Sequence, residues 1–130
     1  MLSLSQKELE RYGRQILIFG ERGQEKLKNT KVAILGLGGL GSAIAYYLVA
    51  AGVGYIKIID GDRVELDNLN RQILHWTPDI GKNKTESAEE KLKKLNPEIK
   101  IEAIHGRITR ENVSKLVGDV DIILDALDNF

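Results

Sequence analysis

The stretch Lys31-Val-Ala-Ile-Leu35, followed at once by Gly36-Leu-Gly38-Gly39-Leu-Gly41, decides the fold of this chain. The first part is predicted to form a buried strand, and a helical pattern begins directly after the glycines. A G-x-G-x-x-G turn between a strand and a helix brings backbone N–H groups to a helix N-terminus, where partial positive charge attracts an anion. The sequence therefore predicts a phosphate site with a nucleotide as its occupant. The alternative is a glycine-rich turn without a ligand.

Strands and helices alternate around this turn. The expected strands are Val32–Leu35, Tyr55–Ile59, Ile99–Ile104 and Val120–Leu124, and the expected helices between them are Leu40–Ala51, Lys84–Leu95 and Glu111–Val117, the last capped by Thr109. Nearly unbroken apolar strands are typical of a parallel sheet that is covered on both faces. The order predicts an α/β fold, namely a Rossmann-like parallel sheet with helices on both faces and the strand order 3-2-1-4.

Residues 1–30 precede this pattern and are expected to form an N-terminal helical arm, while residues 31–130 form the nucleotide-binding domain. Ser5 and Glu8 have the spacing of a capping box, and Leu4 and Leu9 occupy the staple positions beside it. We expect a helix over Gln6–Ile18 that ends before Gly20, and a second short helix over Gln24–Lys28.

Composition limits the class of protein. The 130 residues suit one domain, and 19 basic residues balance 19 acidic ones, so nothing points to a nucleic-acid partner. The N-terminus lacks a signal-peptide pattern, and the longest apolar stretch, Ala43–Val53, is too short to cross a bilayer. The sequence contains no cysteine, which excludes disulfides and thiolate metal sites within it. We expect a cytoplasmic protein without membrane contact.

Asp60 ends the second expected strand, 24 positions after Gly36 (60 − 36). A carboxylate about 20 residues beyond the glycine motif accepts hydrogen bonds from ribose hydroxyls in dinucleotide-binding folds. We therefore expect Asp60 to bind ribose; the alternative is a turn residue beside Gly61. At this point NAD and ATP fit equally well.

Two cations around the long connection after Asp60 favour ATP. Arg71 and Lys84 can stabilise charge that develops on phosphates during phosphoryl or adenylyl transfer, which hydride transfer does not require. Lys84 also falls in the first turn of its expected helix, where a cation opposes the helix dipole and a bound anion would offset that cost. The alternatives are a solvated surface lysine and an ion pair between Arg71 and a nearby aspartate.

Acidic residues follow the fourth expected strand. A carboxylate at Asp128 could hold Mg²⁺, which takes one or two carboxylates together with phosphate oxygens and water. We interpret Asp125 as a cap or turn residue. His75 and His105 lack partners at the spacing of a metal site or a catalytic triad, and we interpret both as structural.

Taken together, these motifs resemble the ThiF/MoeB/HesA family of adenylyltransferases, which are related to the ubiquitin-activating enzymes. The resemblance covers nearly the whole chain in order, and its motifs are Arg11-Tyr-Gly-Arg14-Gln-Ile-Leu, Gly36-Leu-Gly-Gly-Leu-Gly41, Asp60 with Val64-Glu-Leu-Asp-Asn-Leu-Asn-Arg71-Gln-Ile, Gly81-Lys-Asn-Lys84 with Glu86-Ser-Ala, and Leu124-Asp-Ala-Leu-Asp128-Asn129.

The resemblance implies ATP- and Mg²⁺-dependent adenylation of the C-terminal glycine carboxylate of a ubiquitin-like sulfur carrier protein, similar to ThiS or MoaD. It implies that Arg14 reaches into the site of a partner subunit in a homodimer, and that Asp128 holds magnesium. The implied catalytic residues are Arg14, Arg71, Lys84 and Asp128. The implied nucleotide-binding residues are Gly36, Gly38, Gly39, Gly41, Asp60, Asn68, Arg71, Lys84, Asp128 and Asn129.

Family members continue for about the same length again, into further strands, a carrier-docking surface and, usually, cysteine pairs that bind zinc. We therefore expect a truncated product, a cleaved chain or one half of a split pair, with zinc absent from these residues. The strand Val120–Leu124 would lie at an open edge of the sheet, which is a pairing hazard. We expect a second chain, identical or complementing, to cover it.

Two other functions stay open at this point. One is a non-catalytic nucleotide-binding or dimerisation module that binds ATP without turnover. The other is a small NAD-dependent oxidoreductase, which would bind NADH preferentially. The sequence also leaves open whether the carrier serves molybdopterin, thiamine, tRNA thiolation or protein conjugation.

Overall fold

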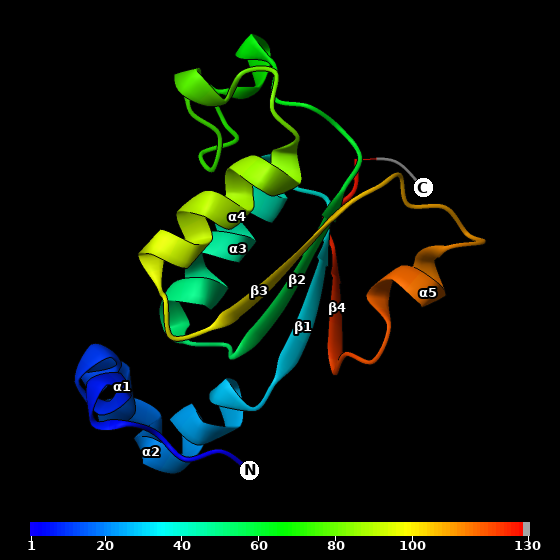
Figure 1. The fold of residues 1–130 in the computed structure, drawn as a ribbon. Coiled ribbons are helices and arrows are strands. Elements are labelled where there is room, and N and C mark those ends of the chain that lie inside the picture. The colour runs from blue at the N-terminus through cyan, green and yellow to red at the C-terminus, as the bar shows by residue number, and fades with distance from the viewer. Residues whose placement is uncertain (129–130) are drawn as a thin grey trace.

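The computed structural model describes residues 1–128 and contains one four-stranded parallel sheet (Figure 1). Its strands are β1 (Lys31–Leu35), β2 (Tyr55–Asp60), β3 (Lys100–His105) and β4 (Ile122–Asp125). They lie in the order β3-β2-β1-β4, and every neighbouring pair is parallel. The predicted α/β fold and strand order are confirmed.

Helices cover the two faces of the sheet unequally. On one face lie α3 (Gly39–Ala51) and α4 (Lys84–Leu95), and on the other lies the short α5 (Val113–Val117) (Figure 1). Two separate apolar clusters result, because side chains alternate between the faces of a strand. Val32, Ile34, Ile56 and Ile58 belong to the cluster under α3 and α4, whereas Ala33, Leu35 and Ile59 pack with α5.

A buried lysine fastens α5 to the sheet. Lys57 lies on the α5 side of β2 and donates hydrogen bonds from Nζ to the carbonyl oxygens of Leu116 and Val117, at 3.1 and 2.9 Å. These carbonyls end the helix, where a cation complements the helix dipole. The short helix α5 begins two residues later than expected, because Thr109 and Asn112 exchange hydrogen bonds and form a turn in place of its first residues.

The N-terminal arm differs from the single helix expected over Gln6–Ile18. It contains α1 (Gln6–Arg11) and α2 (Gly13–Lys28), separated at Tyr12, and α2 is kinked at Gly20, where φ is +77°. The predicted capping box at Ser5 and the interruption at Gly20 are confirmed. The break at Tyr12 has a tertiary cause that the local pattern does not contain: the Tyr12 ring is buried, and its hydroxyl accepts a hydrogen bond from Asn96 at 2.8 Å.

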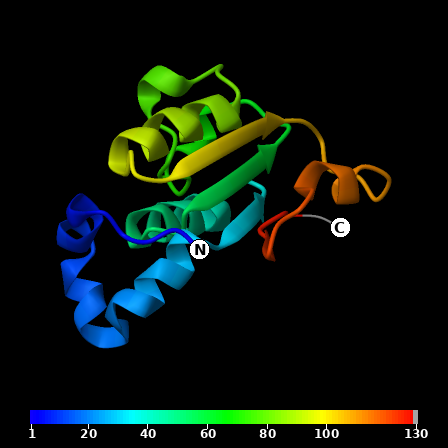
Figure 2. The same cartoon turned by 60° about the horizontal axis from the view of Figure 1, so that its bottom comes forward.

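The arm packs against the end of α3 that lies farthest from the glycine turn (Figure 2). Gln15 and Gln24 both donate to the carbonyl oxygen of Ala51, at 2.6 and 2.8 Å. Gly52 follows with φ +91°, and an added Cβ there would approach the Tyr12 ring and the Gln24 amide to 2.6 Å. Glycine at this position therefore lets the arm close on α3.

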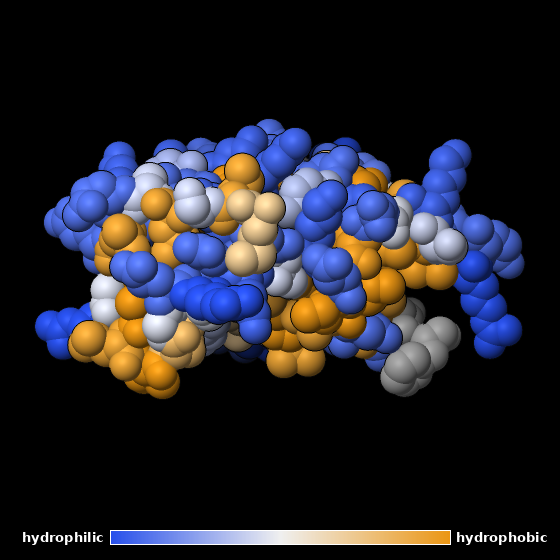
Figure 3. Space-filling model, turned by 90° about the horizontal axis from the view of Figure 1, so that it is seen from below, coloured by the Kyte–Doolittle hydropathy of each residue, from blue (hydrophilic) through white to orange (hydrophobic). Residues whose placement is uncertain are grey.

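Apolar surface stays exposed in two places. Leu17 and Ile18 of α2 are 84% and 85% exposed, and apolar patches interrupt the polar surface on the side of the molecule where the arm lies (Figure 3). The predicted open edge at β4 is also present, with Ile122 and Ile123 48% and 50% exposed. Among residues 1–128, no helix combines the length and apolar character needed to cross a membrane.

Candidate functional site

A hollow of about 510 Å³ opens where the four strands end. Leu35 ends β1, Asp60 ends β2, Gly106 follows β3 and Asp125 ends β4, and all four residues line the hollow. Ligands of open α/β sheets bind at this edge, outside the carboxyl ends of the strands. Of the predicted site residues, only Asp60 lines this hollow; the glycine turn, Arg71 and Lys84 lie outside its lining.

The glycine turn connects β1 to α3 beside this hollow. Gly36 has φ +94°, and a Cβ added at Gly41 would lie 1.9 Å from the Gly36 carbonyl oxygen, so the turn and its helix require glycine at both positions. Gly38 and Gly39 differ from them, because a Cβ there would meet its nearest atom only at 3.6 Å. Packing among residues 1–128 does not explain glycine at these two positions, whereas close approach of a phosphate to the backbone does.

Asp60 joins the end of β2 to the glycine turn. The carboxylate is buried; its Oδ2 accepts from the Leu37 N–H at 2.8 Å and its Oδ1 accepts from the Asp62 N–H at 2.7 Å. This anchoring role is additional to the predicted binding of ribose. A carboxylate has about four acceptor positions, so two remain for ribose hydroxyls.

Lys84 is the first residue of α4, and its side chain is buried, with the residue only 6% exposed. Among residues 1–128, no carboxylate lies within 4 Å of its ammonium and no side-chain hydrogen bond joins it to another residue. The alternative of a solvated surface lysine in a helix that begins earlier is therefore wrong. The ammonium reaches solvent at the end of this buried stem, and its charge is available to an anionic ligand.

Arg71 lies next to the glycine turn. Its Cγ is the atom nearest to a Cβ added at Gly39. Its exposed guanidinium donates to the Asp67 carbonyl and to the Asn70 side chain, at 2.9 and 2.8 Å, and forms no ion pair within the described residues. The alternative of an Asp–Arg ion pair is therefore wrong, and the charge of Arg71 is available to a ligand.

Asn68 has a role inside the loop that the sequence did not indicate. It ends the short 3₁₀ helix η1 (Leu66–Asn68), and its Oδ1 accepts from the Glu65 N–H at 2.8 Å.

Gln72 follows in the same segment and is buried beside Gly38, and its Oε1 has no partner among the described residues. The Gln72 Nε2 is the nearest atom to a Cβ added at Gly38, at 3.6 Å, so Gln72 offers a ligand at Gly38 an N–H donor.

The acidic residues after β4 are only partly accounted for. The Oδ1 atom of Asp125 accepts from the Leu127 N–H at 3.0 Å, which confirms its interpretation as a turn residue. Asp128 is exposed, and Asn129 lies outside the described residues. Residues 1–128 contain no group of three acidic or histidine side chains that could hold a metal by themselves. The donor set fits a magnesium ion that takes most of its ligands from phosphate and water.

The fold separates Arg14 from the hollow. Arg14 is exposed on α2, in the arm that packs against the far end of α3. It is the one predicted catalytic residue that the described chain does not bring to the carboxyl edge of its own sheet.

Three residues that line the hollow were not predicted as site residues from the sequence: Arg107, Thr109 and Arg110. Their position directly after β3 could have indicated them, because ligands of such sheets lie beyond the strand ends.

His75 lies between the glycine turn and α4. It is 2% exposed, and its two ring nitrogens lie 2.9 Å from Ser87 Oγ and 3.0 Å from the Leu37 carbonyl oxygen. Burial lowers the pKa of the imidazole, although the backbone hydrogen bond opposes this, and the charges of Lys84 and Lys91 lower it further. The interpretation of His75 as a structural residue agrees with its burial.

Comparison with known proteins identifies one family model and several similar proteins. A model of the ThiF family matches residues 12–130. The chain is 44% identical over 128 residues to a sulfur carrier protein adenylyltransferase of Thermus thermophilus, covering 97% of this chain and 47% of that protein. It is 45% identical over 131 residues to a molybdopterin-synthase adenylyltransferase of Haemophilus influenzae, covering 99% and 54%. The chain thus spans about half the length of the curated relatives it matches.

Solved structures show the same similarity. The E. coli tRNA N6-threonylcarbamoyladenosine dehydratase TcdA in complex with ATP superimposes with a TM-score of 0.93 at 29% identity, covering 98% of this chain and 53% of that one. The E. coli protein MccB with ATP superimposes with a TM-score of 0.83 at 40% identity, covering 91% and 37%.

Proposed function

Because the chain belongs to the ThiF family, we propose that it is the nucleotide-binding half of an ATP-dependent adenylyltransferase. Its substrate is the C-terminal glycine carboxylate of a ubiquitin-like sulfur carrier protein, similar to ThiS or MoaD. A carboxylate oxygen attacks the α-phosphorus of ATP, the bond from that phosphorus to the bridging oxygen breaks, and pyrophosphate leaves with the electron pair. The product is an acyl-adenylate. The carboxylate is itself the nucleophile, so no serine, cysteine or histidine is needed.

The unpaired ammonium of Lys84, at the end of a largely buried side chain, is the observation that carries this proposal. It lies at the start of α4, near the glycine turn, and it lacks an anionic partner among residues 1–128. A triphosphate supplies such a partner. A cation held in a site of low polarity also stabilises charge that develops on the phosphates in the transition state, because no solvent has to reorganise around it.

Other residues complete the site. The N–H groups of Gly38 and Gly39 bind phosphate together with Arg71 and Asn68, on a turn that Gly36 and Gly41 shape, and Asp60 binds ribose. Asp128, with Asn129 beside it, holds Mg²⁺, which supplies additional neutralisation of phosphate charge. The reaction then depends on alignment and electrostatic stabilisation, which can together account for large rate enhancements.

The printed names of the relatives support the substrate class. Two relatives at 44% and 45% identity are adenylyltransferases named for a sulfur carrier protein and for molybdopterin synthase. Two structural relatives were solved with ATP. None of these four is named as a dehydrogenase that uses a nicotinamide, so the similarity does not favour an NAD-dependent oxidoreductase.

A second candidate function follows from the position of Arg14. If this arginine serves the site of a partner subunit, the site of an isolated chain lacks one catalytic residue. The 130-residue chain would then bind ATP without turning it over. A homodimer, or a complementing second chain, supplies the missing group.

Two measurements separate these functions. Calorimetry tests whether the chain binds ATP, and pyrophosphate exchange into ATP in the presence of ThiS-like and MoaD-like carriers tests adenylation. Binding with carrier-dependent exchange supports the adenylyltransferase, and binding without exchange supports the second candidate. Folded protein that binds no ATP refutes both.

A further inference from the structure

The two backbone polar groups of Leu37, which belong to consecutive peptide groups of the glycine turn, are both held by buried side chains. The Leu37 N–H donates to Asp60 Oδ2 at 2.8 Å, and the Leu37 carbonyl oxygen lies 3.0 Å from Nε2 of His75. Leu37 is itself fully buried and directly precedes Gly38. The Leu37 carbonyl shares a planar peptide group with the Gly38 N–H, so the contact with His75 sets the direction in which that N–H points.

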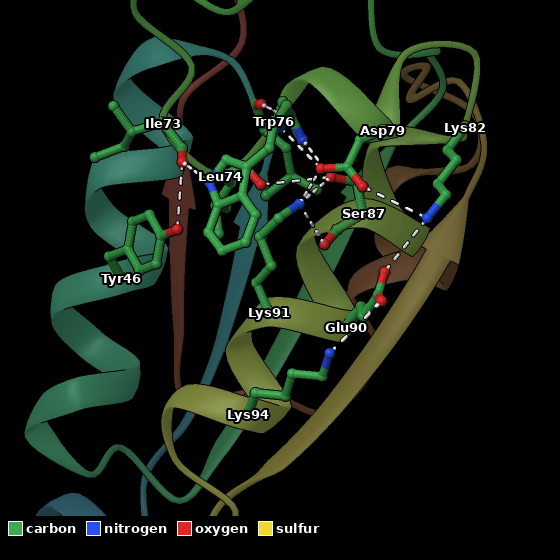
Figure 4. Close-up of polar contacts among 12 residues, drawn as sticks. Tyr46, Ile73, Leu74, Trp76, Asp79, Lys82, Ser87, Glu90, Lys91 and Lys94 are labelled. Atoms are coloured by element: carbon green, nitrogen blue, oxygen red, sulfur yellow. Dashed lines mark hydrogen bonds and ion pairs between the residues drawn. The ribbon is translucent and has the colours of Figure 1, made fainter.

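His75 is held in place by α4. Its Nδ1 lies 2.9 Å from Ser87 Oγ, and Ser87 Oγ accepts from the Lys91 ammonium at 2.8 Å. Lys91 also donates to Asp79 Oδ2, and Asp79 accepts from the Trp76 N–H at 2.8 Å. Figure 4 shows the Lys91 ammonium between Ser87 and Asp79, beside the Trp76 indole. A continuous buried chain of hydrogen bonds thus extends from the glycine turn to the segment around Trp76.

The chemistry of the partners assigns a direction to every bond in this chain. The Leu37 carbonyl can only accept, so His75 Nε2 carries the proton, and Nδ1 of the neutral ring is then an acceptor. The Lys91 ammonium can only donate, so the Ser87 hydroxyl receives from Lys91 and gives its own proton to Nδ1. The Leu74 carbonyl, at 3.4 Å, is the longer alternative for that proton. Only one tautomer of His75 satisfies all these contacts.

We propose that His75 is a positioning residue that orients the Leu37 peptide and thereby presents the glycine turn to the phosphates of ATP. This inference rests on the proposed function for its ligand, but the geometry of the turn itself does not depend on that ligand. His75 acts through Leu37 and does not touch the nucleotide. Ser87 acts one step further away by fixing the tautomer and the orientation of the ring.

Two substitutions at one position separate this role from simple packing. In His75→Gln the amide nitrogen occupies the place of Nε2 and can still donate to Leu37, whereas the acceptor for Ser87 is lost. In His75→Asn the amide oxygen occupies the place of Nδ1 and can still accept from Ser87, but the Leu37 carbonyl loses the donor at 3.0 Å and keeps only the longer contact from Ser42 Oγ at 3.4 Å. Ser87→Ala is a third variant, which leaves the ring in place and removes its support.

The first readout is amide hydrogen exchange of Leu37, with Ile58 in the core of β2 as the reference for global unfolding. We expect exchange at Leu37, relative to Ile58, to become about tenfold faster in His75→Asn and to stay within about twofold of wild type in His75→Gln, because loss of one buried hydrogen bond corresponds to about a tenfold change. The exchange rate of Leu37 in Ser87→Ala should lie between the rates in the two His75 variants. Imidazole nitrogen NMR of the wild type should show the Nε2–H tautomer for His75.

The second readout is ATP affinity by calorimetry on the same 130-residue chains. We expect binding to weaken about fivefold to tenfold in His75→Asn and to change less than about twofold in His75→Gln. If wild type binds no ATP but Leu37 exchange follows the expected order, the proposed function fails and the positioning role stands. If wild type binds ATP and the two His75 variants match each other in both readouts, the positioning role is refuted and the proposed function stands.

Discussion

At the scale of single residues, Lys84 carries the strongest signal of function, because its ammonium has neither an ion pair nor a side-chain hydrogen bond within residues 1–128. Replacing it with methionine keeps an apolar stem of similar length and removes the charge. We expect Lys84→Met to keep the free energy of unfolding within about 0.5 kcal/mol of wild type, because no ion pair or side-chain hydrogen bond is lost. The same variant should bind ATP at least about tenfold more weakly by calorimetry.

Lys93→Met is the matched control, since Lys93 lies on the same helix but is exposed and pairs with Glu89 at the surface. Its stability and ATP affinity should stay close to wild type, because exposed ion pairs contribute little. Loss of stability in Lys84→Met, with unchanged ATP affinity, would mean that the lysine serves the fold and not a ligand.

The buried pair of Asp79 and Lys91 predicts a specific pH dependence. Burial alone raises the pKa of Asp79, but hydrogen bonds from Lys91 and the Trp76 N–H, together with the charge of Lys91, hold the net pKa below its ordinary value. The folded chain therefore releases this proton more easily than the unfolded chain. The stabilisation is complete above about pH 4, and it is lost as the pH falls through the lower pKa of the folded state.

Asp79→Asn should consequently cost about 3 kcal/mol at pH 7, because Lys91 is left buried without its counter-charge. The difference from wild type should shrink as the pH falls below about 4, because the unfolded wild-type chain then takes up the Asp79 proton more readily than the folded chain does. Urea unfolding followed by the fluorescence of Trp76, the one tryptophan in the sequence, measures both values. A difference that is the same at pH 7 and pH 3 would contradict the ion pair.

At the scale of elements, the sequence predicts well those features that local physical chemistry determines. Residues 36–41 identify the strand, the turn and the helix around them, because only glycine permits that turn. The apolar runs identify the strands to within two residues at either end. Asp60 could be predicted at the site because it ends a strand at the edge where ligands bind.

The rest depends on contacts between distant segments. The break at Tyr12 is caused by Asn96, and the burial of Lys84 and His75 depends on how the 61–83 connection folds back over α4 and the glycine turn. Thr109 was expected to cap a helix; its Oγ1 accepts from the Asn112 N–H, as a cap does, but the helix itself begins only at Val113. The roles of Asp128 and Asn129 stay predictions.

The attachment of the arm to α3 can be tested at Gly52. An added methyl group would be strained at φ +91° and would collide with the Tyr12 ring and the Gln24 amide. We expect Gly52→Ala to lower the free energy of unfolding by about 2 kcal/mol. Gly13→Ala is the control, because Gly13 is helical and an added Cβ meets nothing within 4 Å; it should raise stability by about 0.5 kcal/mol. Equal effects of the two substitutions in chemical denaturation would contradict the packing described.

At the scale of the whole molecule, the exposed edge of β4 predicts association. Ile122 and Ile123 leave an apolar parallel strand without a neighbour in the described chain. We expect light scattering to give a mass above the 14.5 kDa of one chain. Ile123→Lys should shift the population toward the single chain of 14.5 kDa, since a lysine on an edge strand opposes pairing. If Leu17→Lys on the arm produces monomers and Ile123→Lys does not, the second copy binds the arm instead of the edge.

The account depends most on the claim that the glycine turn and the buried lysine together bind the triphosphate of ATP. The most direct test is a crystal structure of the chain grown with ATP and Mg²⁺. We predict phosphate oxygens within hydrogen-bond distance of the Lys84 ammonium and of the backbone N–H groups at Gly38 and Gly39, with ribose at Asp60. Clear density for ATP bound elsewhere, with the Lys84 ammonium still unpaired, would contradict the claim.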